Sequence, residues 1–232
     1  MNDDYTYGFD WDNEYCYPNS DILMNKLNIK DQNGLNIAER ELTSLRLAEM
    51  EINQIKGVFD LRHLQDIHKY IFQDIYSWAG ELRKVNISKG NVFCYSENIV
   101  SYGELLFQKI KEENYLMFLD KGDIYERLSY YMSEINALHP FREGNGRAQR
   151  VFISSLGKTA GYEIDFNQVS NKEMIEISSS AFTKGHEEYN DMFKKITNKI
   201  SVKEQIIHIK LISNPNGQLF KVFNELNSMF NI

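Results

Sequence analysis

Residues 139–150 concentrate side chains that could do chemistry. The stretch reads HPFREGNGRAQR and combines a histidine, a carboxylate, an asparagine between two glycines, and arginines. An imidazole exchanges a proton near neutral pH. Arginine forks match phosphate oxygens and stay charged at any relevant pH. These residue types at this spacing favour proton transfer beside a bound anion.

The centre of this stretch has the pattern of an anion site at the start of a helix. Gly144 and Gly146 permit backbone angles that other residues resist, and Asn145 suits the N-cap position. The free N–H groups of a first helical turn, with the helix dipole behind them, attract anions. Arg147 and Arg150 lie three positions apart, so we expect them on one helix face near the same anion.

Glu143 is a carboxylate placed among groups suited to anions. This makes sense if a divalent cation lies between it and the phosphates, as Mg²⁺ does when it is held by one or two carboxylates plus a nucleotide. A tight turn with surface ion pairs is the ordinary alternative, and it would be the better one for a lone Gly-Asn-Gly. The combined set of base, anion site, carboxylate and arginines favours a functional site.

The helices that must position this stretch can be read from the apolar pattern. His139 precedes a proline, which disfavours the helical conformation, so the preceding helix must end there. Phe141 is expected to anchor the loop in the core, and a second helix should run from Asn145 or Gly146 to a capping Gly161. The first helix is predicted from apolar positions three or four apart, namely Ile124, Leu128, Tyr131, Ile135 and Leu138.

The rest of the chain is also dominated by helical periodicity. Further helices are predicted over 35–55, after the breaker DQNG, and over 64–75, 170–198, 201–212 and 218–230. Residues 84–95 differ, because two short β-prone runs flank a Lys89-Gly90-Asn91 turn, which predicts a hairpin. The expected fold is therefore a single all-α domain with one β-hairpin.

Composition narrows the class of protein. The 232 residues are 42% hydrophobic, enough for a core, and 26 basic against 33 acidic residues give a net charge of −7, which disfavours nucleic acid as a partner. The two cysteines, Cys16 and Cys94, suggest a reducing compartment rather than a disulfide framework. No secretion signal or run of about 18 apolar residues is present. We expect a cytosolic protein with no membrane partner, and delivery through an export route that needs no signal would leave the same sequence pattern.

HPFREGNGRAQR resembles the signature of the Fic family (filamentation induced by cyclic AMP), HPFx[DE]GNGRxxR, at every specified position. SWAGELRKVNISKG, at 77–90, resembles the stretch leading into that family's flap hairpin, and 64–72 resembles its upstream helix. The resemblance implies an all-α Fic-fold helical bundle whose β-hairpin is a flap over the active site. It implies a Fic domain at 35–200, preceded by an N-terminal segment at 1–34 and followed by a small helical tail at 201–232.

The resemblance implies a protein adenylyltransferase, which moves AMP from ATP to a Ser, Thr or Tyr hydroxyl of a target protein and releases pyrophosphate. It implies that His139 is the general base and that Glu143 binds Mg²⁺ bridging the phosphates. Arg147 is expected on the phosphate chain and Arg150 on the γ-phosphate. The full set of expected ATP- and phosphate-binding residues is Arg142, Gly144, Asn145, Gly146, Arg147 and Arg150.

The hairpin has an expected role in docking the target. An exposed strand edge can pair with an extended segment of the target and present one hydroxyl. Phe93 or Tyr95 would press on the docked chain. The expected target-docking flap residues are Lys89, Gly90, Asn91, Val92, Phe93 and Tyr95.

Other activities stay open at this point. A kinase-like branch of the family lacks the GNGR segment, which this chain keeps, so AMP transfer is favoured. Transfer of phosphocholine or of another nucleotide is an alternative. A non-catalytic or self-inhibited nucleotide-binding Fic module is the alternative from a different class, and the intact His139 and Glu143 argue against it.

Fic proteins are commonly held inactive by a helix carrying [ST]xxxE[GN]. In this chain [ST]xxxE occurs three times without the final Gly or Asn, at 77–81, 159–163 and 183–187. We therefore expect a toxin-type member, inhibited by a small antitoxin whose glutamate reaches Arg150. A degenerate inhibitory helix within 201–232 is the competing idea. For toxin-type members the family suggests a type II topoisomerase subunit as target.

A few other residues bear on the site. His63 and His68 lie five apart and do not share a helix face, so we expect one packed and one exposed histidine rather than a metal pair. Tyr189 and Asn190 are further candidates for the wall of an adenosine pocket.

Overall fold

The computed structural model describes residues 14–89, 91–213 and 216–230. Its helices are α1 (Gln32–Ile52), α2 (Leu61–Phe72), α3 (Ile99–Glu112), α4 (Lys121–Leu138), α5 (Asn145–Thr159), α6 (Asn171–Lys184), α7 (Glu187–Ile196), α8 (Val202–Ile212) and α9 (Gln218–Phe230). Its strands are β1 (Ser88–Lys89), β2 (Asn91–Val92), β3 (Tyr162–Ile164) and β4 (Thr197–Lys199), and short 3-10 turns lie at η1 (Ser96–Asn98), η2 (Asn114–Leu116) and η3 (Phe166–Gln168). Residues 1–13, part of the expected N-terminal segment, and Gly90 of the expected flap lie outside the described residues.

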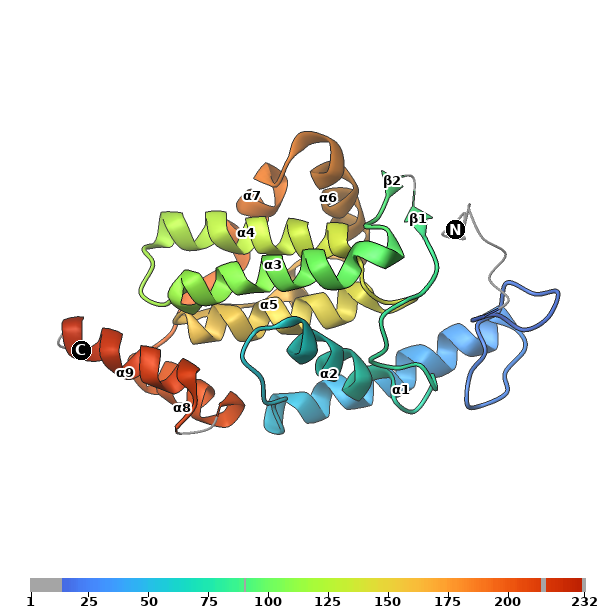
Figure 1. Cartoon of the computed structure of the whole chain (residues 1–232), viewed down its shortest axis with the longest axis horizontal. Helices are drawn as coiled ribbons and strands as arrows, with labels where there is room; N and C mark the ends of the chain where they lie inside the picture. Colours follow the sequence, from blue (N-terminus) through green and yellow to red (C-terminus); the bar gives the residue numbers. More distant parts are fainter. Residues whose placement is uncertain (1–13, 90, 214–215, 231–232) are drawn as a thin grey trace.

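Helices α3, α4 and α5 lie side by side and form the centre of the molecule (Figure 1). Helix α2 packs on α5, and α1 packs on α2 from outside. Helices α6 and α7 cover α4 on the opposite side, and α8 and α9 lie together at one end (Figure 1). The all-α architecture expected from the sequence is confirmed, and the junction between α4 and α5 lies where several helices meet.

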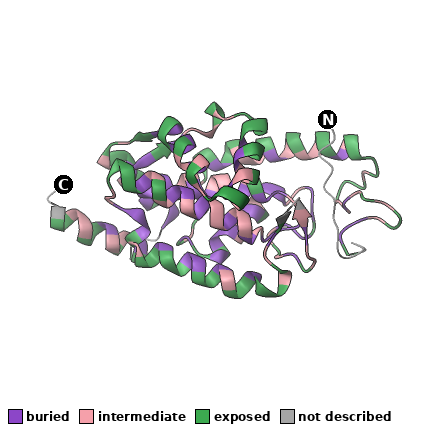
Figure 2. Cartoon of the chain, turned by 90° about the horizontal axis from the view of Figure 1, so that it is seen from above, coloured by how far each residue is buried: buried purple, intermediate pink, exposed green. Residues whose placement is uncertain are grey.

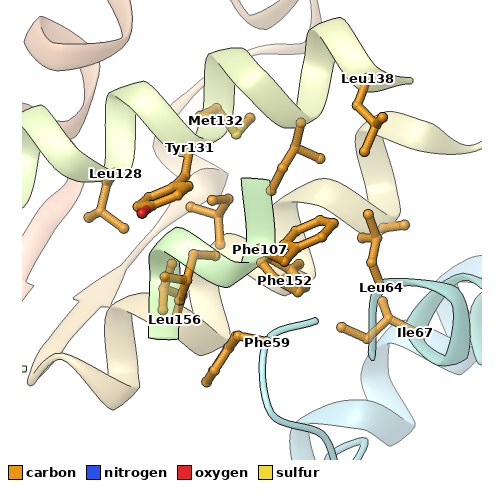
Figure 3. Packing of buried hydrophobic residues seen from close by; sticks show 14 of the residues in the cluster. Phe59, Leu64, Ile67, Phe107, Leu128, Tyr131, Met132, Leu138, Phe152 and Leu156 are labelled. Atoms are coloured by element: carbon orange, nitrogen blue, oxygen red, sulfur yellow. The ribbon is translucent and has the colours of Figure 1, made fainter. Parts of the chain in front are cut away.

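The core explains why that junction is rigid. Buried side chains fill the inner faces of the central helices, whereas their outer faces are exposed (Figure 2). Phe152 of α5 is fully buried and meets the ring of Phe59 edge-on, with centroids 5.5 Å apart (Figure 3). Leu64 of α2 and Leu128 of α4 are also buried in this cluster. Each such side chain contributes about 1.5–3 kcal/mol of transfer free energy, so the helices flanking the junction are firmly held.

The start of α1 differs from the prediction. The sequence DQNG was expected to break the chain before a helix at residue 35. Instead Asp31 is the N-cap, and its Oδ1 accepts a hydrogen bond from the Gly34 N–H over 2.6 Å. The polar residues therefore form the first turn of the helix, because a side-chain cap satisfies one of the N–H groups that a helix start leaves free.

The later part of the chain also corrects the prediction. The helix expected over 170–198 is two helices, because Gly185, with a φ of +87°, ends α6 before α7 begins. Residues 162–164 and 197–199 pair as antiparallel strands, an element that was not predicted. Helix α3 was also missed. The two strands were missed because short strands are specified by a distant partner rather than by their own sequence.

The expected hairpin is present but short. Ser88 pairs with Val92 and Lys89 with Asn91, so each strand has two residues. The flanks expected to be strands, within 84–95, are irregular. Within the described residues, no helix has the length and apolar composition required to cross a membrane.

Candidate active site

A cavity of about 230 Å³ lies at the junction of α4 and α5. The junction forms its floor, the hairpin one side and α6 the other. Its lining from the junction comprises His139, Arg142, Glu143, Gly144, Asn145, Gly146, Gln149 and Arg150. Nearly all of the polar residues singled out in 139–150 therefore converge on one hollow.

Helix α4 ends before His139, as expected for the residue before Pro140, and His139 itself has a left-handed backbone with φ +43°. Its Nδ1 lies 3.2 Å from the carbonyl oxygen of Asn136. A carbonyl only accepts, so this hydrogen bond requires the proton on Nδ1. Nε2 is then the unprotonated ring nitrogen, which is the state of an imidazole able to take a proton.

The loop after His139 is closed by Asn145, whose expected role as the N-cap of α5 is wrong. Asn145 is the first helical residue, and the N-cap is Gly144. The Asn145 side chain accepts from the Phe141 N–H over 2.9 Å and donates to the Phe141 carbonyl over 2.7 Å. Phe141 itself is buried, as expected. Asn145 therefore fixes the shape of the loop.

Gly144 is required for two reasons. Its φ is +81°, a conformation that favours glycine. A Cβ at this position would also lie 2.1 Å from Cζ of Phe72 on α2. The start of α5 can therefore approach α2 only with glycine here. The first N–H groups of a helix have no acceptor within it, and those of α5 begin at the wall of the cavity, so an anion fits this place.

Glu143 lies between the anion site and a second acidic group. Its Oε1 accepts from the Gly144 N–H over 2.8 Å. Burial and the nearby Glu39 carboxylate raise the pKa of Glu143, whereas Arg147 lowers it. Among the described residues there is no group of three or more His, Cys, Asp or Glu that could hold a metal alone. One carboxylate beside an anion site fits Mg²⁺ that is ligated mainly by nucleotide phosphates.

The three arginines of the stretch lie in different places. Arg150 lines the junction cavity and also a second cavity of about 590 Å³ between α1, α2, α5 and β3. Arg147 lines neither of these cavities, and its guanidinium contacts Glu39 of α1 at 2.5 Å. Arg142 lines the junction cavity, and its guanidinium lies 6.0 Å from the ring centroid of Tyr15. The expected shared phosphate-facing surface of Arg147 and Arg150 is therefore divided.

The hairpin borders the cavity through its inner residues. Ile87, Ser88 and Phe93 line the cavity, and the Phe93 ring stacks on the His139 imidazole. Val92 is 50% exposed and Tyr95 is 54% exposed. Of the two aromatic residues expected to press on a docked chain, only Tyr95 faces solvent, whereas Phe93 packs on the histidine.

Sequence reasoning missed Arg83, which connects the hairpin to the junction. This arginine is 2% exposed. Its guanidinium donates to the carbonyls of His139 over 2.8 Å and Val85 over 2.7 Å, and also to the carbonyl of Cys94. It thereby holds both flanks of the hairpin beside the histidine. The only signal in the sequence was an arginine between apolar positions in ELRKV.

His68 of α2 supports the loop between α4 and α5. Its Nε2 lies 2.9 Å from the Glu143 carbonyl, and its Nδ1 accepts from the Gly80 N–H over 2.9 Å, so the proton is on Nε2. Burial lowers the pKa of His68 to about 3. The expectation of one packed and one exposed histidine is wrong, because His63 and His68 are both buried.

Helix α6 supplies a wall that was not predicted, through Met174, Ile175, Ser178, Ser179 and Phe182. Neither Tyr189 nor Asn190, the candidates for an adenosine pocket, lines this cavity. Tyr189 is fully buried and donates to Ser178 Oγ over 2.8 Å, so it stabilises α6 without lining the cavity.

Comparisons with known proteins identify relatives of this chain. Residues 58–156 match the model of the Fic/DOC family. The chain is 42% identical over 167 residues to "Probable protein adenylyltransferase Fic" of Escherichia coli strain K12, covering 72% of this chain and 82% of that protein. It is 42% identical over 169 residues to protein adenylyltransferase VbhT of Bartonella schoenbuchensis, covering 72% of this chain and 35% of VbhT.

Solved structures show the same fold. The N-terminal Fic domain of a VirB-translocated Bep effector protein of Bartonella quintana, with bound ADP, is 28% identical with a TM-score of 0.77 and covers 83% of this chain and 98% of that one. BepC of Bartonella tribocorum, with bound AMPPNP, is 26% identical with a TM-score of 0.74, covering 81% and 98%.

Proposed function

Because the chain belongs to the Fic/DOC family, we propose that it is a protein adenylyltransferase that moves AMP from ATP to a Ser, Thr or Tyr hydroxyl of a target protein. The observation that carries this proposal is the meeting of the His139 imidazole and the N-terminus of α5 at one cavity. A base and an anion site that line one cavity can serve a hydroxyl that attacks a phosphate.

The reaction follows from the state of His139. Nε2, the unprotonated ring nitrogen, takes the proton of the target hydroxyl, and the hydroxyl oxygen bonds to the α-phosphorus. The bond from that phosphorus to the bridging oxygen breaks, and pyrophosphate leaves with the electron pair. A positioned base contributes about 10²–10⁴-fold to such a step.

The remaining proposed roles are electrostatic. The N–H groups at Gly144, Asn145 and Gly146 hold the phosphates, Arg150 meets the γ-phosphate, and Arg142 adds charge at the cavity wall. Glu143 is proposed to hold Mg²⁺, which when bound would offset the charge of the phosphate chain. Transfer of phosphoryl and nucleotidyl groups depends mainly on such positioning and charge.

The proposed docking site for the target is the hairpin, comprising Lys89, Gly90, Asn91, Val92, Phe93 and Tyr95. The exposure of Val92 and Tyr95 supports it, since these side chains are accessible to an extended segment. We assign 35–200 to the catalytic Fic domain, 1–34 to an N-terminal segment and 201–232 to a tail.

Inhibition by a separate small antitoxin is part of the proposal. The cavity of about 590 Å³ supports it, because Arg150 lies in its wall and a partner glutamate seated there would meet this arginine. The competing source is the tail itself, since His208 of α8 lines the same cavity. Removal of residues 201–232 separates the two: activation by truncation favours the tail, and activity of the intact chain that is lost on adding a partner favours the antitoxin.

The proposed place of action is a cytosol, either that of a bacterium or that of a host cell. The description of structurally similar proteins as VirB-translocated effectors supports the second. A bacterial type II topoisomerase subunit is the proposed target if the chain is a toxin.

The test is transfer of label from ATP carrying it on the α-phosphate. Wild type with Mg²⁺ should label a protein of a bacterial or host extract, and mass spectrometry should find a gain of one AMP on a hydroxyl residue. His139→Ala should bind ATP but transfer nothing. Equal labelling by both chains would show that the base is misassigned, and label taken only from a choline nucleotide would favour the phosphocholine alternative.

A further inference from the structure

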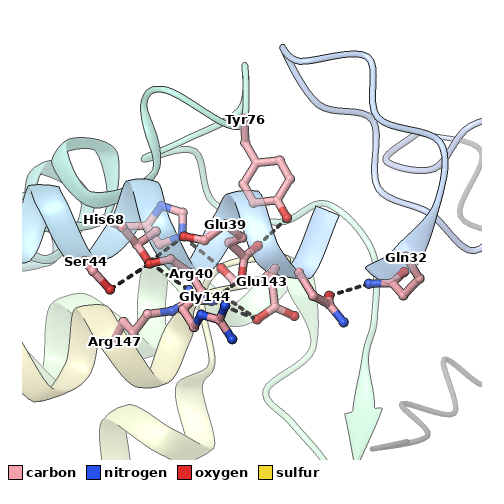
Figure 4. A network of polar contacts seen from close by, with 11 residues as sticks. Gln32, Glu39, Arg40, Ser44, His68, Tyr76, Glu143, Gly144 and Arg147 are labelled. Carbon is pink, nitrogen blue, oxygen red and sulfur yellow. Dashed lines mark hydrogen bonds and ion pairs between the residues drawn. The ribbon is translucent and has the colours of Figure 1, made fainter. Parts of the chain in front are cut away.

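Arg147 is held by a polar network that involves helix α1 and Tyr76, which follows helix α2. Its guanidinium contacts Glu39 Oε1 at 2.5 Å and donates to Thr43 Oγ1 over 3.3 Å, both on α1 (Figure 4). The other carboxylate oxygen of Glu39, Oε2, accepts from the Tyr76 hydroxyl. Each oxygen of Glu39 therefore has its own donor.

The network is largely shielded from solvent. The Glu39 side chain is 15% exposed and that of Arg147 is 22% exposed. The guanidinium lies over the Phe72 ring, 4.6 Å from its centroid, and Tyr76 stacks on Trp78 at 4.3 Å. A shielded ion pair is costly unless both partners are well bonded, and here both are.

Arg147 faces two carboxylates at once. The nitrogen that contacts Glu39 also lies 3.7 Å from Glu143 Oε1, so the bond to Glu39 is the shorter one. Glu143 lines the junction cavity, whereas neither Arg147 nor Glu39 lines it. The Arg147 guanidinium therefore contacts Glu143 from the side away from the cavity.

We propose that Glu39 is a positioning residue, which holds Arg147 away from a close ion pair with Glu143 and so leaves the Glu143 carboxylate available to a divalent cation carried by the nucleotide. The inference rests on the proposed function, in which Glu143 is the carboxylate that meets Mg²⁺. Tyr76 acts with Glu39 by occupying its second oxygen.

The physical reason is competition for one carboxylate. Without the charge of Glu39, Glu143 is the nearest carboxylate left to Arg147, and the 3.7 Å contact would shorten. A carboxylate bonded closely to a guanidinium is a weaker metal ligand. Changes to groups that orient a metal ligand typically cost about 10–100-fold in metal affinity or activity.

The experiment measures the Mg²⁺ dependence of nucleotide binding by calorimetry with a non-hydrolysable ATP analogue, and that of AMP transfer. Glu39→Gln should raise the Mg²⁺ concentration at half-saturation about 10-fold and leave binding without Mg²⁺ unchanged. Glu41→Gln is the matched control, because Glu41 is on the same helix with a side chain 67% exposed. Tyr76→Phe, which removes only the hydroxyl, should shift the value in the same direction.

A double-mutant cycle tests whether Glu39 acts through Arg147. In an Arg147→Gln background, Glu39→Gln should add no further shift in the Mg²⁺ requirement. An unchanged requirement in Glu39→Gln would overturn the inference, as would shifts that multiply in the double variant. If Glu39→Gln does not fold, Tyr76→Phe decides, and a wild-type Mg²⁺ requirement in that variant counts against the inference.

The binding measurement separates this inference from the proposed function. A wild-type chain that binds the analogue with Mg²⁺ but transfers no AMP would contradict the adenylyltransferase proposal alone. A chain that transfers AMP while Glu39→Gln keeps wild-type Mg²⁺ dependence would contradict only the role of Glu39.

Discussion

The ring of Phe93 lies stacked on the imidazole of His139, with centroids 3.8 Å apart and 16° between the ring planes. Phe93 follows β2 of the hairpin, and His139 ends α4. The proposed flap thus touches the proposed base directly. The orientation of the imidazole therefore depends on the hairpin as well as on its own helix.

Phe93→Ala should lower AMP transfer about 10-fold while ATP affinity changes little. Aromatic pairs contribute about 0.5–1.5 kcal/mol beyond their buried area, and the lost stacking would leave the imidazole free to turn. The measurement is the kcat and KM for ATP at saturating target. Tyr95→Ala is the control, because Tyr95 is 54% exposed and should act through target KM. A loss confined to ATP affinity would refute the role of Phe93.

Gly144→Ala should abolish nucleotide binding and destabilise the fold by several kcal/mol, because the added Cβ would lie 2.1 Å from Phe72 Cζ at a φ of +81°. Gly122→Ala is the matched control. Its Cβ would meet nothing within 4 Å, and alanine is favoured over glycine in a helix by up to about 1 kcal/mol. Thermal melting and calorimetry should find Gly122→Ala at least as stable as wild type. Equal effects of the two changes would contradict the assigned geometry.

Arg83→Met should destabilise the protein by about 3 kcal/mol, because the carbonyls of His139, Val85 and Cys94 would lose their donor. Activity should fall further than stability explains, since the hairpin and the histidine would no longer be tied together. Denaturant unfolding and AMP transfer at a temperature where the variant is folded measure the two effects. Arg62→Met, on a side chain 71% exposed, should change neither.

The helices beside the site could be predicted because their information is local. The periodic apolar residues of α4 and the proline after His139 fix where that helix ends. The role of Asn145 could not be predicted in the same way. An asparagine at the start of a helix can cap the helix or can hydrogen-bond the backbone of the preceding loop, as Asn145 does. The N-cap is Gly144, where Phe72 of α2 leaves room only for glycine, and this long-range contact is not visible in the local sequence.

The contacts of Arg147 and Arg83 show a second limit. Helical spacing correctly put Arg147 one turn before Arg150. It could not reveal that α1, more than one hundred residues earlier, supplies Glu39 and draws the guanidinium away from the cavity. Arg83 is bonded to backbone carbonyls, which carry no sequence signature. Both cases depend on long-range packing rather than on residue type.

The stability of the protein should fall as the pH drops below about 6.5, in part because of His68. Burial lowers its pKa to about 3 in the folded state, whereas an unfolded histidine titrates near 6.5. Between these two pKa values the histidine is protonated in the unfolded chain and neutral in the folded chain, so acid favours unfolding. One such group gives a slope of about 1.4 kcal/mol per pH unit. His63 and His208, whose pKa values are also lowered by burial, add to this slope.

His68→Gln keeps a donor for the Glu143 carbonyl. It should reduce the slope of the unfolding free energy against pH by the contribution of one histidine. Urea unfolding of both chains at pH 4.5, 5.5 and 7.5 measures this, and parallel slopes would mean that His68 is not buried as a neutral group.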